Sequence, residues 1–99
     1  MAQRVFDITT KFITALDMIE MDARAVDDLL PAITQIVQAL QNYPNLPADY
    51  KGLQTTTTWQ TKLSALKAFD QISEEEARQL KFELQGAMQH FNDVVLRGH

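Results

Sequence analysis

Apolar residues recur at steps of three and four in four separate stretches of this chain, and this period restricts its fold more than any other feature. Such spacing places the apolar side chains of each stretch on one face of a helix. The first stretch runs from Val5 to Ile19, the second from Val26 to Leu40, the third from Trp59 to Phe69 and the fourth from Ala77 to Val94. No strand-like alternation competes with this pattern. The sequence therefore predicts four amphipathic helices.

Four such helices, joined by short connections, bury their apolar faces most simply as an antiparallel four-helix bundle. The chain has 99 residues, 45% of them apolar, which suffices for one modest hydrophobic core. We therefore predict an all-α fold in which residues 1–99 form a single domain. The core is expected to contain residues from the dominant stripe of each helix: Phe12, Trp59, Leu63, Leu84 and Phe91.

The second helix has an unusual start, because Pro31 follows closely on two aspartates. Proline is tolerated in a first turn, where its missing N–H had no partner. Either Asp27 or Asp28 caps the helix near this point, or the helix starts earlier and bends; a start close to the aspartates is preferred. Before it, Met21 to Arg24 interrupts the helical pattern and predicts a connection.

The third and fourth helices follow polar residues that suit helix starts. Residues 42–54 contain two prolines and a glycine, which predicts an ordered loop. One hydroxyl of Thr55–Thr58 is expected to cap the third helix, which would carry Leu66 as well as Phe69. Ser73 and Glu76 match a capping box with Ser73 as N-cap, so the fourth helix should begin there. Gly98 is expected to end it.

Charge and missing residue types exclude several classes of function. Nine basic residues against thirteen acidic ones give a net charge of -4, so nucleic acid is not an expected partner. The absence of cysteine removes disulfides and thiolate sites, and it fits a reducing compartment. No apolar run approaches the roughly 20 residues that cross a bilayer, and the first residues lack a signal-peptide core. No direct membrane insertion is therefore expected.

The chain lacks the residue sets on which most catalytic and metal sites are built. Its two histidines, His90 and His99, have no second histidine or cysteine at metal-ligand spacing, and Glu83 with His90 does not make a site. Its only serines are Ser64 and Ser73, the second of which is explained by capping. The three glycines are scattered. We therefore expect no catalytic residues, no metal and no cofactor.

Several residues outside the core stripes are candidates for a partner surface. At about 100° per residue, Phe6 and Ile13 lie roughly 120–140° from the centre of the first apolar stripe, beside Asp17. Phe82 lies about 200° from its apolar neighbours on the last helix, close to Gln85. These apolar side chains either fill interfaces between neighbouring helices or bind another protein. Acidic residues around the first connection form either a solvated corner or a site for a basic partner: Asp17, Glu20, Asp22, Asp27 and Asp28.

Several segments, taken in order and spacing, resemble one known family. They include a Leu-Pro-x-Asp-aromatic loop at Leu46–Tyr50, the pair Gln54-Thr55 ahead of Trp59, and a Phe-x-Leu pattern at Phe82–Leu84. Over nearly its whole length the chain resembles the C-terminal domain of the vacuolar protein sorting-associated protein 28 family, whose members are subunits of the ESCRT-I complex. Further matching segments are residues 12–17, 24–28 and 78–84.

This resemblance implies an independently folded four-helix bundle that acts as an adaptor in sorting ubiquitinated membrane cargo into multivesicular bodies. The implied partners are the ubiquitin-binding subunit of ESCRT-II, through a zinc-finger insert in some lineages, and an ESCRT-III subunit. Other ESCRT-I subunits would bind an N-terminal region outside this chain, at the cytoplasmic surface of the late endosome. The alternative is a structural bundle that acts by oligomerisation.

The expected partner surface combines the first and last helices. Lys81 departs from the family, which tends to have an apolar residue there, so a surface contact at this position is expected to differ. The partner-binding residues predicted from the sequence are Phe6, Ile13, Asp17, Phe82 and Gln85.

Overall fold

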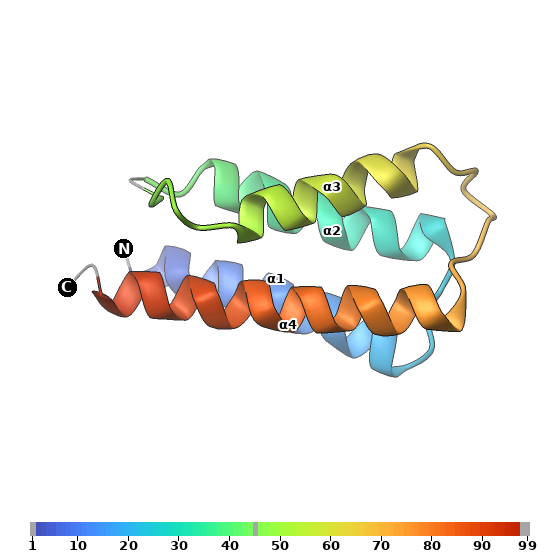
Figure 1. Cartoon of the computed structure of the whole chain (residues 1–99), viewed down its shortest axis with the longest axis horizontal. Coiled ribbons are helices and arrows are strands. Elements are labelled where there is room, and N and C mark those ends of the chain that lie inside the picture. Colours follow the sequence, from blue (N-terminus) through green and yellow to red (C-terminus); the bar gives the residue numbers. More distant parts are fainter. Residues whose placement is uncertain (1, 45, 98–99) are drawn as a thin grey trace.

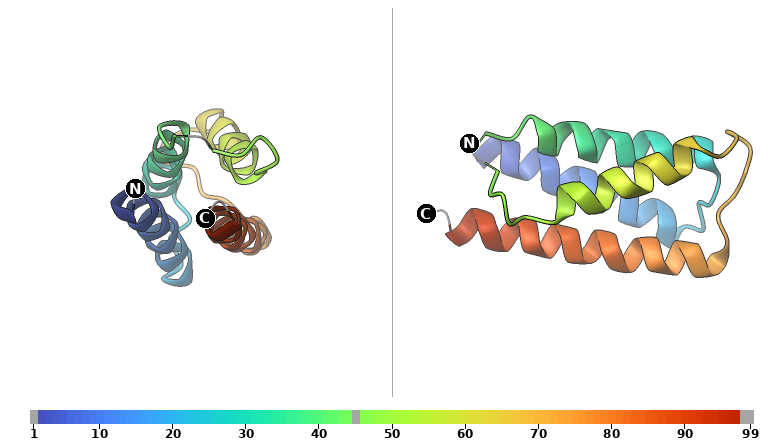
Figure 2. Two further views of the ribbon diagram at one scale, coloured as in Figure 1. Left: turned by 90° about the vertical axis from the view of Figure 1, so that its left-hand side faces the viewer. Right: turned by 45° about the horizontal axis from the view of Figure 1, so that its top comes forward.

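The protein is an up-and-down bundle of four helices, as the computed structural model shows for residues 2–44 and 46–97 (Figure 1). The helices are α1 (Ala2–Glu20), α2 (Val26–Gln41), α3 (Gly52–Ser64) and α4 (Glu74–Arg97). Each helix packs against two others, in the pairs α1–α2, α2–α3, α3–α4 and α1–α4. Viewed end-on, they occupy the four corners of a bundle whose extents are 42 × 22 × 21 Å (Figure 2). The predicted fold class is confirmed.

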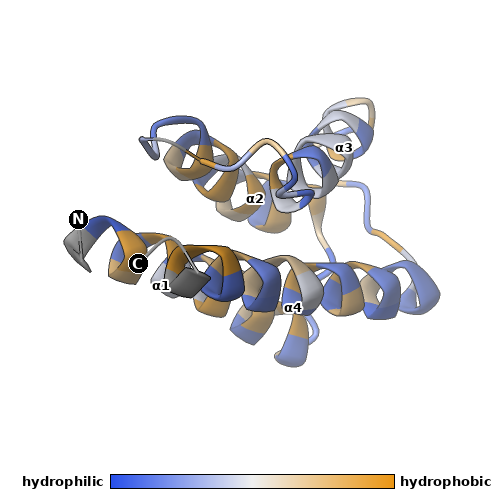
Figure 3. Cartoon of the chain, turned by 60° about the vertical axis from the view of Figure 1, so that its left-hand side comes forward, coloured by the Kyte–Doolittle hydropathy of each residue, from blue (hydrophilic) through white to orange (hydrophobic). Residues whose placement is uncertain are grey.

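The core lies along the bundle axis, where the apolar stripes of the helices meet (Figure 3). Phe12, Leu63, Leu84 and Phe91 are fully buried and Trp59 is 6% exposed, so the predicted core residues are confirmed. Aromatic contacts close one end of this core, because the rings of Tyr43 and Tyr50 pack edge-on against Phe91 at centroid distances of 5.4 and 5.9 Å.

The start of α2 agrees with the predicted position but not with the predicted cap. The helix begins at Val26, and its N-cap is Ala25 with no side-chain hydrogen bond, so capping by Asp27 or Asp28 was wrong. Instead the backbone N–H groups of Val26 and Asp27 donate to the carbonyls of Asp70 (2.9 Å) and Ala68 (3.0 Å). The connection between α3 and α4 thus satisfies the free donors of this helix end. The two aspartates stay exposed in the first turn, where the helix dipole favours negative charge.

Helix α3 begins earlier than the threonine run suggests, so the predicted threonine cap is wrong. Its first residue is Gly52, and the hydroxyls of Thr55, Thr56 and Thr58 donate to the carbonyls four residues before them at 3.1, 3.0 and 2.8 Å. These threonines therefore lie inside the helix and bond to its own backbone.

The end of α3 also differs from the expectation, because the helix stops at Ser64. Leu66 and Phe69 belong to the connection that follows and are 39% and 76% exposed, so their predicted place on the helical stripe is wrong. After Ser64 the chain crosses to α4, and on the way this connection bonds to the connection between α1 and α2. The N–H of Ile72 donates to the carbonyl of Arg24 at 2.9 Å, and the Ile72 side chain enters the core.

The predicted capping box at the start of α4 is confirmed. The N–H of Glu76 donates to Ser73 Oγ at 3.0 Å, and the N–H of Ser73 donates to Glu76 Oε1 at 2.9 Å. The Ser73 backbone bond, followed by the bond from Lys62, lowers the pKa of the Glu76 carboxyl. The predicted helix end at Gly98 lies outside the described residues.

Candidate functional site

The apolar side chains singled out on α1 point away from the core. Phe6 is 73% exposed and Ile13 is 45% exposed, and Asp17 is exposed beside them. Their spacings of seven and four residues place all three on one face of the helix. Phe6 and Ile13 therefore do not fill an interface between neighbouring helices. The alternative that they serve only to pack one helix against another is wrong.

The residues singled out on α4 are exposed as well, on a helix that packs beside α1. Phe82 is 71% exposed and Gln85 is exposed. Two contacts join the helices: Thr9 Oγ1 donates to Asn92 Oδ1 at 3.5 Å, and Lys81 forms an ion pair with Glu20 at the end of α1. We call the surface formed by Phe6, Ile13, Asp17, Phe82 and Gln85 the α1–α4 face.

These two contacts fix how the α1–α4 face is laid out. Because the helices are antiparallel, Asp17 and Gln85 lie at nearly the same level along the bundle. By the same register Phe6 and Phe82 lie about 13 residues apart along the axis, which corresponds to roughly 20 Å. Asp17 and Gln85 therefore lie close to the level of Phe82, and Phe6 lies toward the other end of the face, with Ile13 between.

Lys81 lies on the α1 side of this surface. Its ion pair with Glu20 crosses from α4 to α1, and both side chains are substantially exposed. An exposed pair of this kind contributes little to stability. Its effect is to make the border of the face beside Phe82 charged.

The histidine and carboxylate considered for chemistry have structural partners. His90 packs against the ring of Tyr50 at 5.2 Å between centroids. The Glu83 carboxylate accepts bonds from Trp59 Nε1 (2.9 Å) and Gln79 Nε2 (2.6 Å). Among residues 2–44 and 46–97, no group of three histidines, cysteines or acids is arranged to hold a metal; His99 lies outside this part. No helix in the same part is long and apolar enough to cross a membrane.

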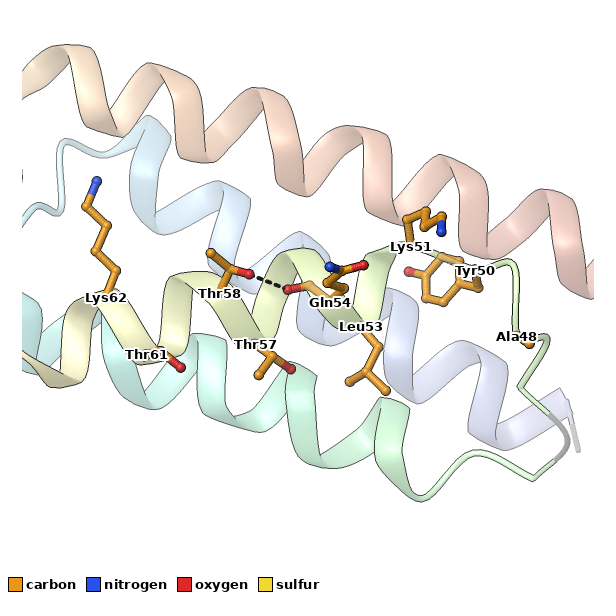
Figure 4. A pocket seen from close by; sticks show the side chains of 9 residues that line it. All are labelled: Ala48, Tyr50, Lys51, Leu53, Gln54, Thr57, Thr58, Thr61 and Lys62. Carbon is orange, nitrogen blue, oxygen red and sulfur yellow. Dashed lines mark hydrogen bonds between the residues drawn. The ribbon is translucent and has the colours of Figure 1, made fainter.

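Sequence reasoning missed one surface feature, an open groove of about 750 Å³ along α3 (Figure 4). We call it the α3 groove; its lining includes Leu53, Thr57 and Thr61, with Lys51 and Lys62 at opposite ends. The threonine run was interpreted only as a helix cap, although four threonines inside a helix present methyl groups as well as hydroxyls. That run was the signal from which the groove could have been found.

A second missed feature is the support of this groove by Tyr50. The buried Tyr50 hydroxyl donates to the carbonyl of Ala87 on α4 at 2.7 Å, and burial raises the pKa of this phenol. The ring lies against Gly52, where a methyl group would overlap the Tyr50 hydroxyl and approach its Cε1 to 2.8 Å. The absence of a side chain at Gly52 thus lets the first turn of α3 seat against the loop before it.

The family model for VPS28 protein matches residues 1–95 of this chain. The chain belongs to the VPS28 family. It is 36% identical over 93 residues to the vacuolar protein sorting-associated protein 28 homologs of Caenorhabditis briggsae and Caenorhabditis elegans, covering 94% of this chain and 44% of each relative. It is also 30% identical over 90 residues to homolog 2 of Arabidopsis thaliana, covering 91% and 43%. The chain therefore spans less than half the length of these curated relatives.

Several residues that carry the VPS28 resemblance have structural roles. Tyr50 anchors the loop to α4, the Trp59 indole bonds to Glu83 across the α3–α4 interface, and Leu84 is fully buried. Phe82, from the same pattern as Leu84, is instead exposed on the α1–α4 face. These members of the VPS28 pattern therefore help to specify the bundle, whereas Phe82, like Ile13, faces outward.

Proposed function

We propose that this VPS28-family domain is a non-catalytic adaptor of ESCRT-I that recruits ESCRT-II and/or ESCRT-III subunits during multivesicular-body sorting of ubiquitinated cargo. The observation that carries the proposal is the exposure of Phe6 and Phe82, at 73% and 71%, on two helices that pack side by side. Family membership supports the sorting role, because the curated relatives are named for vacuolar protein sorting.

The α1–α4 face has the composition of a small protein-binding surface. Interface energy concentrates in a few apolar or aromatic side chains surrounded by polar ones. Phe6, Ile13 and Phe82 would be the anchors, and Asp17 and Gln85 would supply polar contacts between them. Covering one anchor contributes about 2 kcal/mol, so its loss would weaken binding roughly thirtyfold.

The expected partner of this face is the ubiquitin-binding subunit of ESCRT-II, and an ESCRT-III subunit is the second candidate. A region outside this chain would hold the remaining ESCRT-I subunits. The protein would then work at the cytoplasmic surface of the late endosome through its partners, without a membrane-inserting segment of this domain.

The test compares Ile13→Asp and Phe82→Ala with the parent domain. Helical content and melting temperature are measured first, and the ESCRT-II ubiquitin-binding subunit is then titrated by calorimetry. Phe69→Ala is the matched control, because Phe69 is 76% exposed but lies on the connection between α3 and α4. The proposal expects roughly thirtyfold weaker binding for each α1–α4 variant and unchanged binding for the control.

Two results would redirect this assignment. If both variants fold and bind as the parent does, the contact surface lies elsewhere, and the acidic corner of Asp22, Asp27 and Asp28 is tested next. Sedimentation equilibrium addresses the alternative that the bundle acts by oligomerisation. A mass that rises with concentration in the parent but not in Phe82→Ala would show that the same face pairs two copies.

A further inference from the structure

Gly86 is a residue that neither the backbone nor the packing of the bundle explains. It lies in the middle of α4, where a helical backbone favours alanine over glycine. A methyl group added there would meet nothing within 4 Å, so no neighbouring side chain requires a residue without one. The chain therefore carries a destabilising residue at a position where its own fold does not need it.

The position of Gly86 connects it to Phe82, the exposed aromatic residue of α4. Four residues separate them, so Gly86 lies one helical turn from Phe82 and about 40° around the helix, on the side away from α1. Phe82 itself lies almost opposite the buried stripe of α4, which occupies one corner of the bundle (Figure 2). A partner that covers Phe82 on this outermost line of the helix therefore reaches Gly86 as well.

The backbone of α4 is uncovered at Gly86, between side chains one turn before and one turn after it. Phe82 and His90 flank this stretch, and the eight residues from one to the other span about 12 Å along the axis. The diameter of one helix with its side chains is about 10–12 Å. The acidic side chain within one turn, Glu83, already accepts a bond from Trp59 Nε1 at 2.9 Å. The space over Gly86 thus has the width of a single helix and no unpaired charge within one turn.

We propose that a helix of the partner crosses α4 at Gly86, with a small residue facing the glycine and an apolar side chain against Phe82. The distance at which two helices cross depends on the side chains at the contact, and glycine permits the closest approach. This inference rests on the proposed adaptor function, and it extends the contact with the α1–α4 face past Phe82 to Gly86.

Hydrogen bonding favours a helix over an extended segment as the occupant. The N–H and C=O groups in the middle of α4 are paired within the helix, so the backbone at Gly86 offers no free partner. An extended segment lying on it would have its own N–H and C=O groups covered and unpaired. A crossing helix pairs these groups internally and loses nothing by close approach.

The test separates the stability of the fold from the binding of the partner. Gly86→Ala and Gly86→Leu are compared with the parent in thermal unfolding and in calorimetric titration with the ESCRT-II ubiquitin-binding subunit. Alanine and leucine have similar helix propensities, so these variants differ mainly in bulk. Gln38→Leu is the matched control, because Gln38 is exposed on α2, which does not pack against α4.

Both Gly86 variants should unfold about 4–8 °C above the parent and still bind the partner more weakly. We expect about tenfold weaker binding for alanine and at least about a hundredfold for leucine, because the larger side chain holds the two helices farther apart. Gln38→Leu should bind as the parent does. A glycine without a role in the contact would give the same gain in stability with unchanged affinity.

Photo-crosslinking identifies what lies over this part of α4. The chain has no cysteine, so a single Gln89→Cys variant can carry a benzophenone group beside Gly86. The segment of the purified ESCRT-II subunit that it captures is located by mass spectrometry. Glycine, alanine or serine should lie within one turn of the crosslink, among apolar residues at steps of three and four. Apolar residues at steps of two would indicate a strand and overturn the assignment of a helix.

Failure of this inference can be told apart from failure of the proposed function. If Phe82→Ala weakens binding while both Gly86 variants bind as the parent does, the partner stops short of Gly86; the inference is then wrong and the adaptor function stands. Equal weakening by alanine and leucine would point to stiffening of α4 instead of close approach, and would also refute it. If the parent binds neither the ESCRT-II subunit nor an ESCRT-III subunit, both proposals are wrong. A mass that rises with concentration in the parent but not in Gly86→Leu would assign the contact to a second copy of this chain instead.

Discussion

Two glycines of this chain should respond in opposite directions to the same substitution. Gly52 opens α3 under the ring of Tyr50, whereas a methyl group at Gly86, in the exposed middle of α4, would meet nothing within 4 Å. Gly86→Ala should therefore stabilise the domain by about 1 kcal/mol through helix propensity alone. Gly52→Ala should destabilise it, because the new methyl group displaces Tyr50.

The loss at Gly52 can be estimated from the Tyr50 contacts. The ring gives up its hydrogen bond to Ala87, worth about 1 kcal/mol, and its edge contact with Phe91, worth about 0.5–1.5 kcal/mol. Partial exposure of a side chain that is now 5% exposed adds a similar amount. After subtraction of the small propensity gain, the net loss is about 2–3 kcal/mol, or a melting temperature lower by roughly 10–20 °C.

Thermal and urea unfolding, followed by circular dichroism, would measure both variants against the parent. Gly52→Ala made in a Tyr50→Ala background is the internal control. There the obstacle is gone, and the substitution should be neutral or stabilising. If Gly52→Ala and Gly86→Ala raise the melting temperature alike in the parent background, the proposed packing of Tyr50 over α3 is refuted.

Three further stability measurements follow from the same contacts. Phe91→Ala should cost about 3–5 kcal/mol because the side chain is fully buried; a melting temperature within a degree or two of the parent would contradict its place in the core. Ser73→Ala should cost about 1 kcal/mol in urea unfolding, and an unchanged midpoint would argue against the capping box. Since the pKa of Glu76 is lowered from 4.5 in the folded state, its contribution is present above that value and is lost as pH falls below it. Glu76→Gln should flatten the pH dependence of unfolding in this acidic window, and an unaltered profile would count against the assignment.

The features that were predictable from the sequence are those that depend on neighbours in the chain. The period of apolar residues places Phe12, Leu84 and Phe91 in the core without knowledge of what covers them. The capping box of Ser73 and Glu76 closes within four residues, so its residue types suffice to predict it. The outward direction of Phe82 follows from its angle to the stripe on the same helix.

The features that were missed depend on contacts between distant segments. No residue near Asp27 indicates that the carbonyl of Ala68 will receive its N–H and make an aspartate cap unnecessary. Likewise, α3 starts at Gly52, directly after a tyrosine whose hydroxyl bonds to Ala87 far along the chain, and local threonine preferences cannot reveal that contact. At the starts of both α2 and α3, tertiary contacts therefore outweighed the local preference for a capping side chain.

The candidate surfaces likewise have features that the sequence predicts and features that depend on contacts between distant segments. Exposure of Phe6 and Ile13 was open to prediction from helical angles, but their register against α4 was not, because it is set by packing between helices. The threonine run is a sequence signal for the α3 groove, but the shape of the groove was not predictable, because it depends on how the loop before α3 folds beside it, with Tyr50 among its lining residues.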